Sequence, residues 1–201
     1  VAPKPASLDH ITAAASPHAV LTAWQGLYEL AQLQAGQKVL IHGAAGGVGH
    51  IAVQLAKLRG ATVIGTASLN APFLAGLGVD QVINYATTPF ESAVHDVDVV
   101  LDLVGGETQR RSYAVLKPGG VLVSAVQMPD ADTAAMYGVR QHLIMTNPPI
   151  GPALTDVAHL VDAGKLKPYV SQVFALQDIQ QAHTLIEQHH ACGKIAIQIS
   201  A

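Results

Sequence analysis

The sequence predicts an α/β fold in which helices cover both faces of a parallel sheet of about six strands. Short runs of Val, Ile and Leu, typical of strands buried on both faces, recur through residues 38–145. Segments with apolar residues at helical spacing separate these runs. Half of the 201 residues are apolar and 12% are charged, so the chain can bury a sizeable core.

The expected strands and helices alternate along the first three quarters of the chain. A linker-like start, Val1-Ala2-Pro3-Lys4-Pro5, leads into a helical stretch at residues 9–31. Continuous apolar runs predict strands at residues 38–42, 62–65, 81–84, 97–101, 121–126 and 142–145. Helical spacing predicts helices at residues 48–58, 71–77, 89–93 and 107–116, and the turn Lys117-Pro118-Gly119-Gly120 is expected to end the last of them.

The pattern changes after Pro148-Pro149. A helix is expected at residues 154–163, followed by an extended segment at 169–176. A second helix is expected at residues 178–189, and a last strand at 194–199. This part is expected to lie outside the main sheet.

The composition argues against several classes of function. The formal net charge of −3 gives no attraction for nucleic acid or for an anionic membrane surface. Cys192 is the one cysteine, so neither an internal disulfide nor a cysteine-rich zinc cluster can form. No apolar run is long enough to span a bilayer. We therefore expect a cytoplasmic protein without nucleic-acid or membrane partners.

The glycines Gly43, Gly46 and Gly49 form a regularly spaced loop between the first expected strand and the helix after it. Glycine there allows a tight turn and lets the backbone approach a pyrophosphate closely. The helix N-terminus then presents unpaired N–H groups and the positive end of its dipole to that anion. A Walker loop would need Lys and then Ser or Thr after the last glycine, where this sequence has His50-Ile51. The loop predicts a Rossmann dinucleotide-binding domain.

The end of the second strand bears on the choice between NADPH and NADH. A Rossmann domain that prefers NAD usually has Asp or Glu about 20 residues after the loop begins, whereas residues 60–79 contain no acid. The hydroxyl of Ser68 stands there instead and would accept a 2′-phosphate that an acid would repel. Because no Lys or Arg lies between Arg59 and Arg110, Ser68, Tyr85 and backbone groups would have to hold this phosphate. The sequence therefore favours NADPH over NADH and disfavours a methyltransferase.

Several blocks of sequence, in order, resemble the medium-chain dehydrogenase/reductase superfamily. Within it they are most similar to the zinc-independent, NADPH-dependent quinone oxidoreductases. The blocks span essentially the whole chain and lie at residues 21–24 (Leu-Thr-Ala-Trp), 39–49, 54–57, 77–85, 102–106, 116–120 and 193–195.

This resemblance implies an architecture and an activity. The family joins a Rossmann domain to a GroES-like catalytic domain, most of which we expect to be missing from this sequence, with a remnant at the C-terminus. Residues 1–30 are expected to be a linker and helix entering the cofactor domain, and residues 31–150 the Rossmann domain. Residues 151–201 are expected to be closing helices and a return strand toward the missing catalytic domain. The implied activity is hydride transfer from NADPH to a quinone or an α,β-unsaturated carbonyl (an enone).

Two other interpretations stay open at this point. A non-catalytic dinucleotide-binding or sensing module would have no GroES-like sequence upstream of Val1. A fragment of a zinc-dependent alcohol dehydrogenase would need metal ligands upstream, because a catalytic zinc requires three protein ligands. No metal ligand and no catalytic residue can be identified in these 201 residues.

The resemblance also implies positions for the cofactor. Gly46, Gly47 and Val48, with the loop glycines Gly43 and Gly49, would lie on the pyrophosphate, while Thr22 would lie near the nicotinamide. The remaining contacts implied are Ser68 and Tyr85 at the 2′-phosphate, and Val104, Gly105, Ser124 and Val126 along the ribose and nicotinamide. Asp102, which follows an apolar strand, is expected to cap the next turn. Relatives often pair their last Rossmann strand across a two-fold axis, so we expect a homodimer through residues 142–146.

Overall fold

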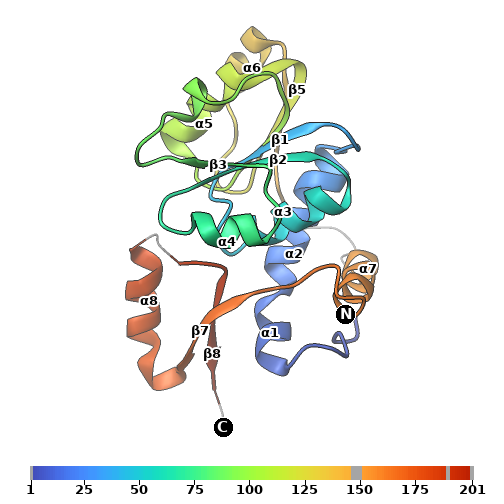
Figure 1. Cartoon of the computed structure of the whole chain (residues 1–201), viewed down its shortest axis with the longest axis vertical. Helices are drawn as coiled ribbons and strands as arrows, with labels where there is room; N and C mark the ends of the chain where they lie inside the picture. The colour runs from blue at the N-terminus through green and yellow to red at the C-terminus, as the bar shows by residue number, and fades with distance from the viewer. Residues whose placement is uncertain (1, 146–150, 189–190, 200–201) are drawn as a thin grey trace.

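Six apolar runs pair as parallel strands of one sheet, in the spatial order β3-β2-β1-β4-β5-β6. The computed structural model describes residues 2–145, 151–188 and 191–199, and Figure 1 shows this sheet in the upper part of the molecule. The direction of winding reverses between β1 and β4, which in open α/β sheets leaves a crevice at the carboxyl ends of the strands. The strands are β1 (Lys38–Ile41), β2 (Thr62–Ala67), β3 (Gln81–Asn84), β4 (Val97–Asp102), β5 (Leu116–Ser124) and β6 (Arg140–Leu143).

Successive side chains of each strand pack on opposite faces of the sheet. Val39 and Ile41 belong to the larger cluster of buried apolar side chains, together with α3 (Gly49–Leu58). Leu40, which lies between them, belongs to a second cluster on the other face. Both faces are thus covered, and the predicted doubly wound parallel sheet is confirmed.

Four short helices connect the strands at or near the positions that the sequence predicts. They are α3, α4 (Ala71–Gly76), the 3-10 turn η2 (Phe90–Ser92) and α5 (Gly106–Ser112). α3 ends because Gly60 takes a left-handed backbone conformation, with φ of +80°, and the Gly60 amide donates to the carbonyl of Lys57.

The predicted boundaries between residues 107 and 126 are wrong. The helical part stops earlier and continues as a 3-10 turn, η3 (Tyr113–Val115). β5 then begins at Leu116, the last residue of the expected helix, because Leu116 pairs with Val97 before the register shifts. The strand also ends at Ser124 rather than at residue 126.

The sheet ends with one helix that the sequence did not predict and with a strand that lies earlier than predicted. α6 (Ala131–Tyr137) follows Asp130, which accepts a hydrogen bond from the Thr133 amide, and ends at left-handed Gly138. β6 begins and ends two residues before the predicted 142–145. Thr146, the last residue of the predicted dimer edge, lies outside the described residues.

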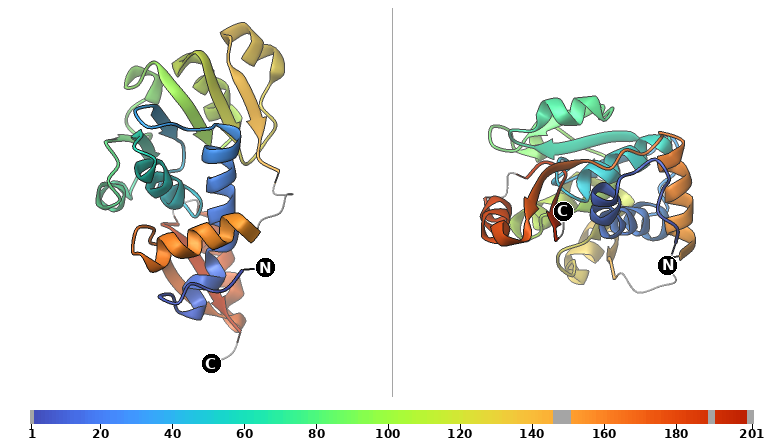
Figure 2. Two further views of the ribbon diagram at one scale, coloured as in Figure 1. Left: turned by 90° about the vertical axis from the view of Figure 1, so that its right-hand side faces the viewer. Right: turned by 90° about the horizontal axis from the view of Figure 1, so that it is seen from below.

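The predicted helical stretch at residues 9–31 folds as three consecutive pieces. They are α1 (His10–Ala15), α2 (Pro17–Trp24) and a π-helix, η1 (Gln25–Leu30). Pro17, which has no N–H to donate, opens α2. Figure 2 (left) shows α7 (Gly151–Asp162) crossing α2 below the main sheet. Asp162 of α7 also accepts hydrogen bonds from the amide and hydroxyl of Ser7.

The C-terminal part forms a second, smaller sheet. β7 (Val170–Ala175) and β8 (Lys194–Gln198) pair in parallel, with α8 (Ile179–Glu187) between them in sequence. The expected return strand, β8, thus pairs with residues 170–175 of this chain, and its relation to a catalytic domain stays a prediction. Residue 189, the predicted end of the last helix, lies outside the described residues. The domain boundaries at residues 30 and 150 stay predictions.

None of the described helices is both long enough and apolar enough to cross a membrane.

Candidate dinucleotide site

The glycine loop is a tight turn that larger residues could not form. Gly43 follows β1 with φ of +66°, in the left-handed region, and its carbonyl accepts a hydrogen bond from the Gly46 amide at 3.0 Å. A Cβ added to Gly49 would lie 2.2 Å from this same carbonyl oxygen. The loop therefore needs glycine at Gly43 for its backbone angle and at Gly49 for close packing of α3.

Within the described chain, the two residues that precede Gly49 have unpaired backbone N–H groups. Among the described residues, neither the Gly47 nor the Val48 amide has an acceptor. α3 begins directly after them, so its positive dipole end faces the same point. This arrangement fits an anion such as a pyrophosphate.

A buried histidine supports the loop from below. His42 is 1% exposed, and its Nε2 lies 2.9 Å from Ser112 Oγ. Because the Ser112 hydroxyl donates to the Thr108 carbonyl, His42 Nε2 must carry the proton and donate to Ser112. Its Nδ1 then accepts from the Thr66 hydroxyl at 3.3 Å, and Thr66 Oγ1 in turn accepts from the Gly43 amide.

Burial keeps this histidine uncharged. Desolvation lowers the pKa of His42 from 6.5 to about 4, and the negative charge of Asp102 offsets part of that effect. The neutral ring therefore joins β1, β2 and α5 beneath the loop at neutral pH.

Asp102 fixes the opposite side of the crevice. Its Oδ1 accepts hydrogen bonds from the amides of Val104, at 3.0 Å, and Gly105, at 2.8 Å. The prediction that Asp102 caps this turn is confirmed. Its Oδ2 accepts from the Ser124 hydroxyl and from Gln109 Nε2, each at 2.9 Å. The fully buried carboxylate thus has four donors.

Two valines form an apolar wall at this turn. Val104 is 54% and Val126 is 51% exposed. A Cβ added to Gly43 would lie 3.5 Å from a Val104 methyl, and one added to Gly105 would lie 2.9 Å from a Val126 methyl. The structure therefore brings Gly43, Val104, Gly105 and Val126 together at the carboxyl ends of β1, β4 and β5.

Ser68 and Tyr85 also come together. The Tyr85 hydroxyl donates to Ser68 Oγ at 3.0 Å, from the ends of β3 and β2. Leu69, the next residue, is 72% exposed. Asp80 lies before β3, at the opposite edge of the sheet, where it bonds Lys57 and the Val63 amide. No acid from these elements therefore stands beside Ser68.

Two predicted residues use their side chains elsewhere. Thr22 is buried and its hydroxyl donates to the carbonyl of His18, one turn earlier in α2. Ser124 is completely buried and its hydroxyl bonds Asp102. Ser124 therefore supports the wall from beneath, and direct contact of either residue with a cofactor stays a prediction.

Lys194 is a candidate site residue that was not predicted from the sequence. The Gly193 amide donates to the Ala45 carbonyl at 2.8 Å, which places the start of β8 on the glycine loop. A Cβ added to Gly47 would lie 2.9 Å from Lys194 Cδ and 3.6 Å from its Nζ. No carboxylate of the described residues forms an ion pair with this ammonium group. Residues 193–195 were one of the segments that resemble the superfamily, but their position beside the glycine loop follows only from the fold.

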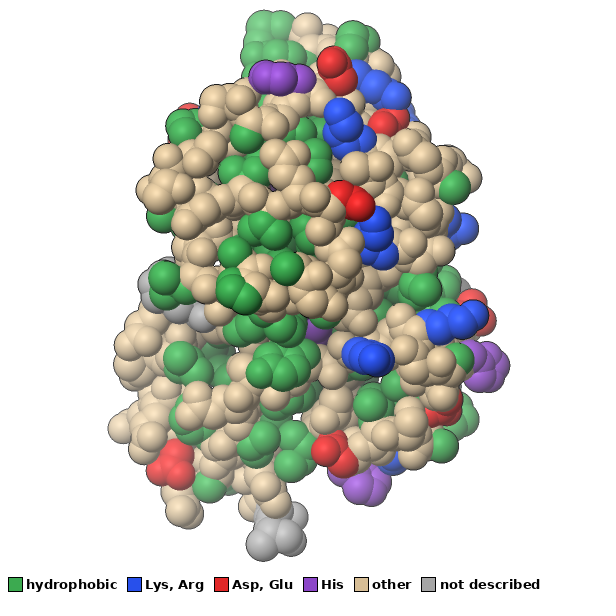
Figure 3. Space-filling view, viewed as in Figure 1, with side chains coloured by type: hydrophobic (Ala, Val, Ile, Leu, Met, Phe, Trp, Pro, Cys, Tyr) green, Lys and Arg blue, Asp and Glu red, His purple; other side chains and the backbone are tan. Residues whose placement is uncertain are grey.

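Other chemistry is sparse around the crevice. Within the described ranges, no group of three His, Cys, Asp or Glu residues is placed to hold a metal ion. Burial raises the pKa of the Cys192 thiol, which opposes a role as a nucleophile. On the face shown in Figure 3, the Lys and Arg side chains are few and separated.

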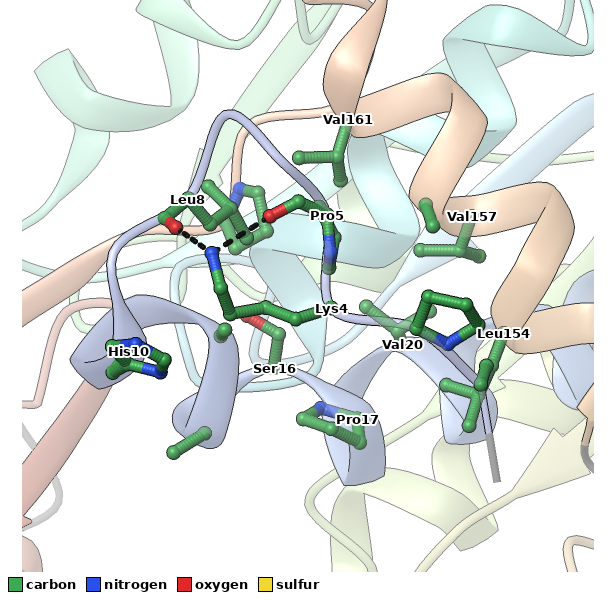
Figure 4. Close-up of a pocket in the computed structure, with 16 residues that line it drawn as sticks. Lys4, Pro5, Leu8, His10, Ser16, Pro17, Val20, Leu154, Val157 and Val161 are labelled. Atoms are coloured by element: carbon green, nitrogen blue, oxygen red, sulfur yellow. Dashed lines mark hydrogen bonds between the residues drawn. The ribbon is translucent and has the colours of Figure 1, made fainter.

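A separate cavity of about 340 Å³ lies between the N-terminal segment, α1, α2 and α7. Figure 4 shows its mainly apolar lining and Lys4, whose ammonium group donates to the carbonyls of Pro5 and Leu8. None of the predicted cofactor residues lines this cavity. It is therefore not the dinucleotide site.

Comparisons with known proteins agree with this geometry. Residues 77–197 match the family model described as zinc-binding dehydrogenase. The Danio rerio protein named NAD(P)H oxidoreductase RTN4IP1, mitochondrial, is 34% identical over 230 residues, covering 99% of this chain and 59% of the relative. The chain thus spans about three fifths of the length of the curated relatives that it matches first.

Solved structures share the whole described fold. A quinone oxidoreductase from Coxiella burnetii has a TM-score of 0.92 and 38% identity, covering 98% of this chain and 63% of that one. The Escherichia coli quinone oxidoreductase complexed with NADPH has a TM-score of 0.85 and 29% identity, covering 98% and 67%. The chain therefore belongs to the zinc-binding dehydrogenase family of the medium-chain dehydrogenase/reductase superfamily, and it is quinone oxidoreductase-like.

Proposed function

We propose that this chain binds NADPH across the crevice at the carboxyl ends of β1, β4 and β5. The free amides of Gly47 and Val48 and the N-terminus of α3 would hold the pyrophosphate. The ammonium group of Lys194 would add a positive charge on the same side. The observation that carries this proposal is the pair of loop amides, Gly47 and Val48, that have no acceptor among the described residues and directly precede α3.

The ribose and nicotinamide would lie along the opposite wall. Asp102 holds the 103–105 turn rigid through two backbone bonds, so Val104 presents a fixed apolar surface. Val126 extends that surface. When bound, NADPH supplies the hydride, while these residues orient its ring and exclude water on one side.

We propose a preference for NADPH over NADH that rests on hydroxyl groups. Ser68 and Tyr85 present two neighbouring hydroxyls at the ends of β2 and β3, and residues 60–79 contain no Asp or Glu. Hydroxyls can donate to a 2′-phosphate, whereas an acid there would repel it. Since residues 60–109 contain no Lys or Arg, we expect a modest preference.

The proposed reaction is hydride transfer to a quinone or an enone. Its support is the family together with the names of solved relatives, two of which are quinone oxidoreductases. Because the chain spans only part of those relatives, we expect the 201 residues alone to bind NADPH but to turn over substrate slowly. An assay of NADPH oxidation with a panel of quinones and enones tests this: fast turnover by the 201-residue chain would refute the dependence on further residues.

A dinucleotide-binding module without turnover is the second candidate. It is favoured by the crevice, where the exposed side chains of the wall are valines and offer no proton. Nucleotide binding without NADPH oxidation, both by this chain and by a longer gene product that contains it, would select this candidate.

The partner and location predictions remain proposals. We propose a homodimer formed through β6, which lies at the open edge of the sheet. A monomer mass by light scattering at micromolar concentration would refute it. We also propose a cytoplasmic location, whereas the name of the zebrafish relative places that protein in mitochondria.

A further inference from the structure

His50 is a buried residue of the first turn of α3 that the proposed chemistry does not use. Its side chain is 0% exposed. Its Nδ1 lies 2.9 Å from the carbonyl oxygen of Gly46, in the glycine loop. Its Nε2 lies 3.1 Å from the amide of Tyr169, which directly precedes β7. One ring therefore bonds the loop on one side and the small sheet on the other.

The two contacts fix the tautomer of this ring. The Tyr169 amide can only donate, so Nε2 must be the acceptor and carry no proton. Nδ1 then carries the proton and donates to the Gly46 carbonyl. Burial lowers the pKa of His50, and the nearby charge of Lys194 acts in the same direction. The neutral ring thus serves as donor and acceptor at once.

The bond to Gly46 orients the Gly47 amide, which we propose as a donor to the phosphate. The carbonyl of Gly46 and the amide of Gly47 belong to one peptide plane, in which they point in opposite directions. His50 holds this carbonyl inward through both its ring and its own amide, which donates to it at 3.1 Å. The Gly47 N–H is thereby turned outward.

The bond to Tyr169 helps to position the second proposed phosphate ligand, the ammonium group of Lys194. The carbonyl of Tyr169 accepts a hydrogen bond from the Lys194 amide at 2.9 Å, which holds the first residue of β8. The Lys194 side chain then returns over Gly47. The contacts therefore form a closed circuit, which runs from the Gly46–Gly47 peptide through His50, Tyr169 and Lys194 back to Gly47.

We infer that His50 is a positioning residue that aligns the Gly47 amide and the Lys194 ammonium group on the same phosphate. The inference rests on the proposed dinucleotide site and adds to it a coupling between the glycine loop and the second sheet. Lys194 contributes fully to nucleotide binding only while His50 holds Tyr169. The coupling makes the position of β7 and β8 part of the affinity for the cofactor.

Three variants separate the two hydrogen bonds of the His50 imidazole. An Asn side chain places a donor near the position of Nδ1, so His50→Asn keeps the bond to Gly46 and loses the one to Tyr169. A Gln side chain places an acceptor near the position of Nε2, so His50→Gln keeps the bond to Tyr169. His50→Leu removes both. Gln54→Leu is the matched control, because Gln54 bonds the backbone of Lys167 and the carbonyl of His50 but neither the His50 imidazole nor the Tyr169 amide.

The decisive test is a double-mutant cycle with Lys194→Met, measured as the dissociation constant for NADPH. In the wild-type and Gln54→Leu backgrounds we expect Lys194→Met to weaken binding roughly tenfold to a hundredfold, as loss of one charge-assisted hydrogen bond does. In the His50→Asn and His50→Leu backgrounds the same change should cost less than about threefold. Equal losses in all four backgrounds would overturn the inference.

A second measurement does not depend on nucleotide. Hydrogen exchange of the Tyr169 amide in the free protein should stay slow in His50→Gln and become fast in His50→Asn. Unchanged protection in His50→Asn would overturn the link through Tyr169. Failure of wild-type protein to bind NADPH, with the exchange pattern as expected, would instead refute the proposed function and leave the link to the small sheet standing.

Discussion

The amide of Gly193 donates a hydrogen bond of 2.8 Å to the carbonyl oxygen of Ala45, which joins the last strand of the chain to the glycine loop near its beginning. This bond places Lys194 beside the two free amides of the loop. The candidate phosphate site therefore combines the glycine loop at residues 43–49 with Lys194, which lies about 150 residues later in the sequence. A change in the C-terminal segment should alter nucleotide binding although it lies outside the Rossmann sheet.

Lys194→Met should weaken NADPH binding while leaving the fold intact. Loss of one charge-assisted contact to a phosphate corresponds to about 1.5–3 kcal/mol, or roughly tenfold to a hundredfold in the dissociation constant. The difference from wild type should shrink at high salt, because the lost term is a charge interaction. Fluorescence titration at two salt concentrations measures this.

Lys165→Met is the control for that variant, since Lys165 lies exposed after α7. It should bind NADPH like wild type. If both variants bind equally well, Lys194 is not part of the phosphate site.

Gly49→Ala should disrupt the loop. The new methyl group would lie 2.2 Å from the Gly43 carbonyl oxygen, so the loop or α3 must move. We expect a loss of about 1–3 kcal/mol in the free energy of unfolding, typical of overpacking, and at least tenfold weaker NADPH binding. Chemical denaturation and titration measure the two effects.

Gly76→Ala provides the comparison. A Cβ at this exposed helical glycine meets nothing within 4 Å, so the change should stabilise α4 by about 0.5–1 kcal/mol and leave NADPH binding unaltered. Wild-type nucleotide affinity in Gly49→Ala would contradict the assignment of the loop.

The preference between the two nucleotides should respond to charge near Ser68. Leu69→Arg adds a cation at an exposed position next to Ser68 and should tighten NADPH binding several-fold, with little effect on NADH. Ser68→Asp adds an acid where the 2′-phosphate is expected and should invert the preference. Side-by-side dissociation constants test this, and an unchanged ratio in both variants would place the 2′-phosphate elsewhere.

His42 should make the protein less stable in mild acid. In the unfolded chain it gains a proton as the pH falls through 6.5, but in the fold only near 4. Stability is thus fully present above the unfolded value and is lost as the pH falls through this window, by at most about 3 kcal/mol. His42→Asn should flatten the dependence of the unfolding free energy between pH 6.5 and 4.5.

Exposed His95 offers the control for the pH dependence. His95→Asn should keep the slope of wild type. A slope in His42→Asn as steep as that of wild type would assign the acid sensitivity to other groups.

The local features of the site could be predicted because their causes lie in neighbouring residues. Gly43 is required by its own left-handed backbone angle, and Gly49 is required by its close contact with the Gly43 carbonyl six residues earlier. Asp102, the last residue of β4, caps the turn that directly follows this strand. Such features depend on short stretches of sequence, so the pattern alone identifies them.

Other features depend on packing between distant segments. The early start of β5 depends on pairing of Leu116 with Val97, and the position of Lys194 depends on docking of β8 against the loop. Neither has a local signal. α6 buries only Ala134 and so shows no apolar periodicity, although the caps Asp130 and Gly138 were readable in the sequence.

Calorimetric titration of the 201-residue chain with NADPH and NADH, beside Gly49→Ala, tests the central claim most directly. We predict saturable binding of one nucleotide per chain, tighter for NADPH than for NADH and at least tenfold weaker in the variant. Folded wild-type protein that binds neither nucleotide at millimolar concentration, or a Gly49→Ala variant that binds as tightly as wild type, would contradict it.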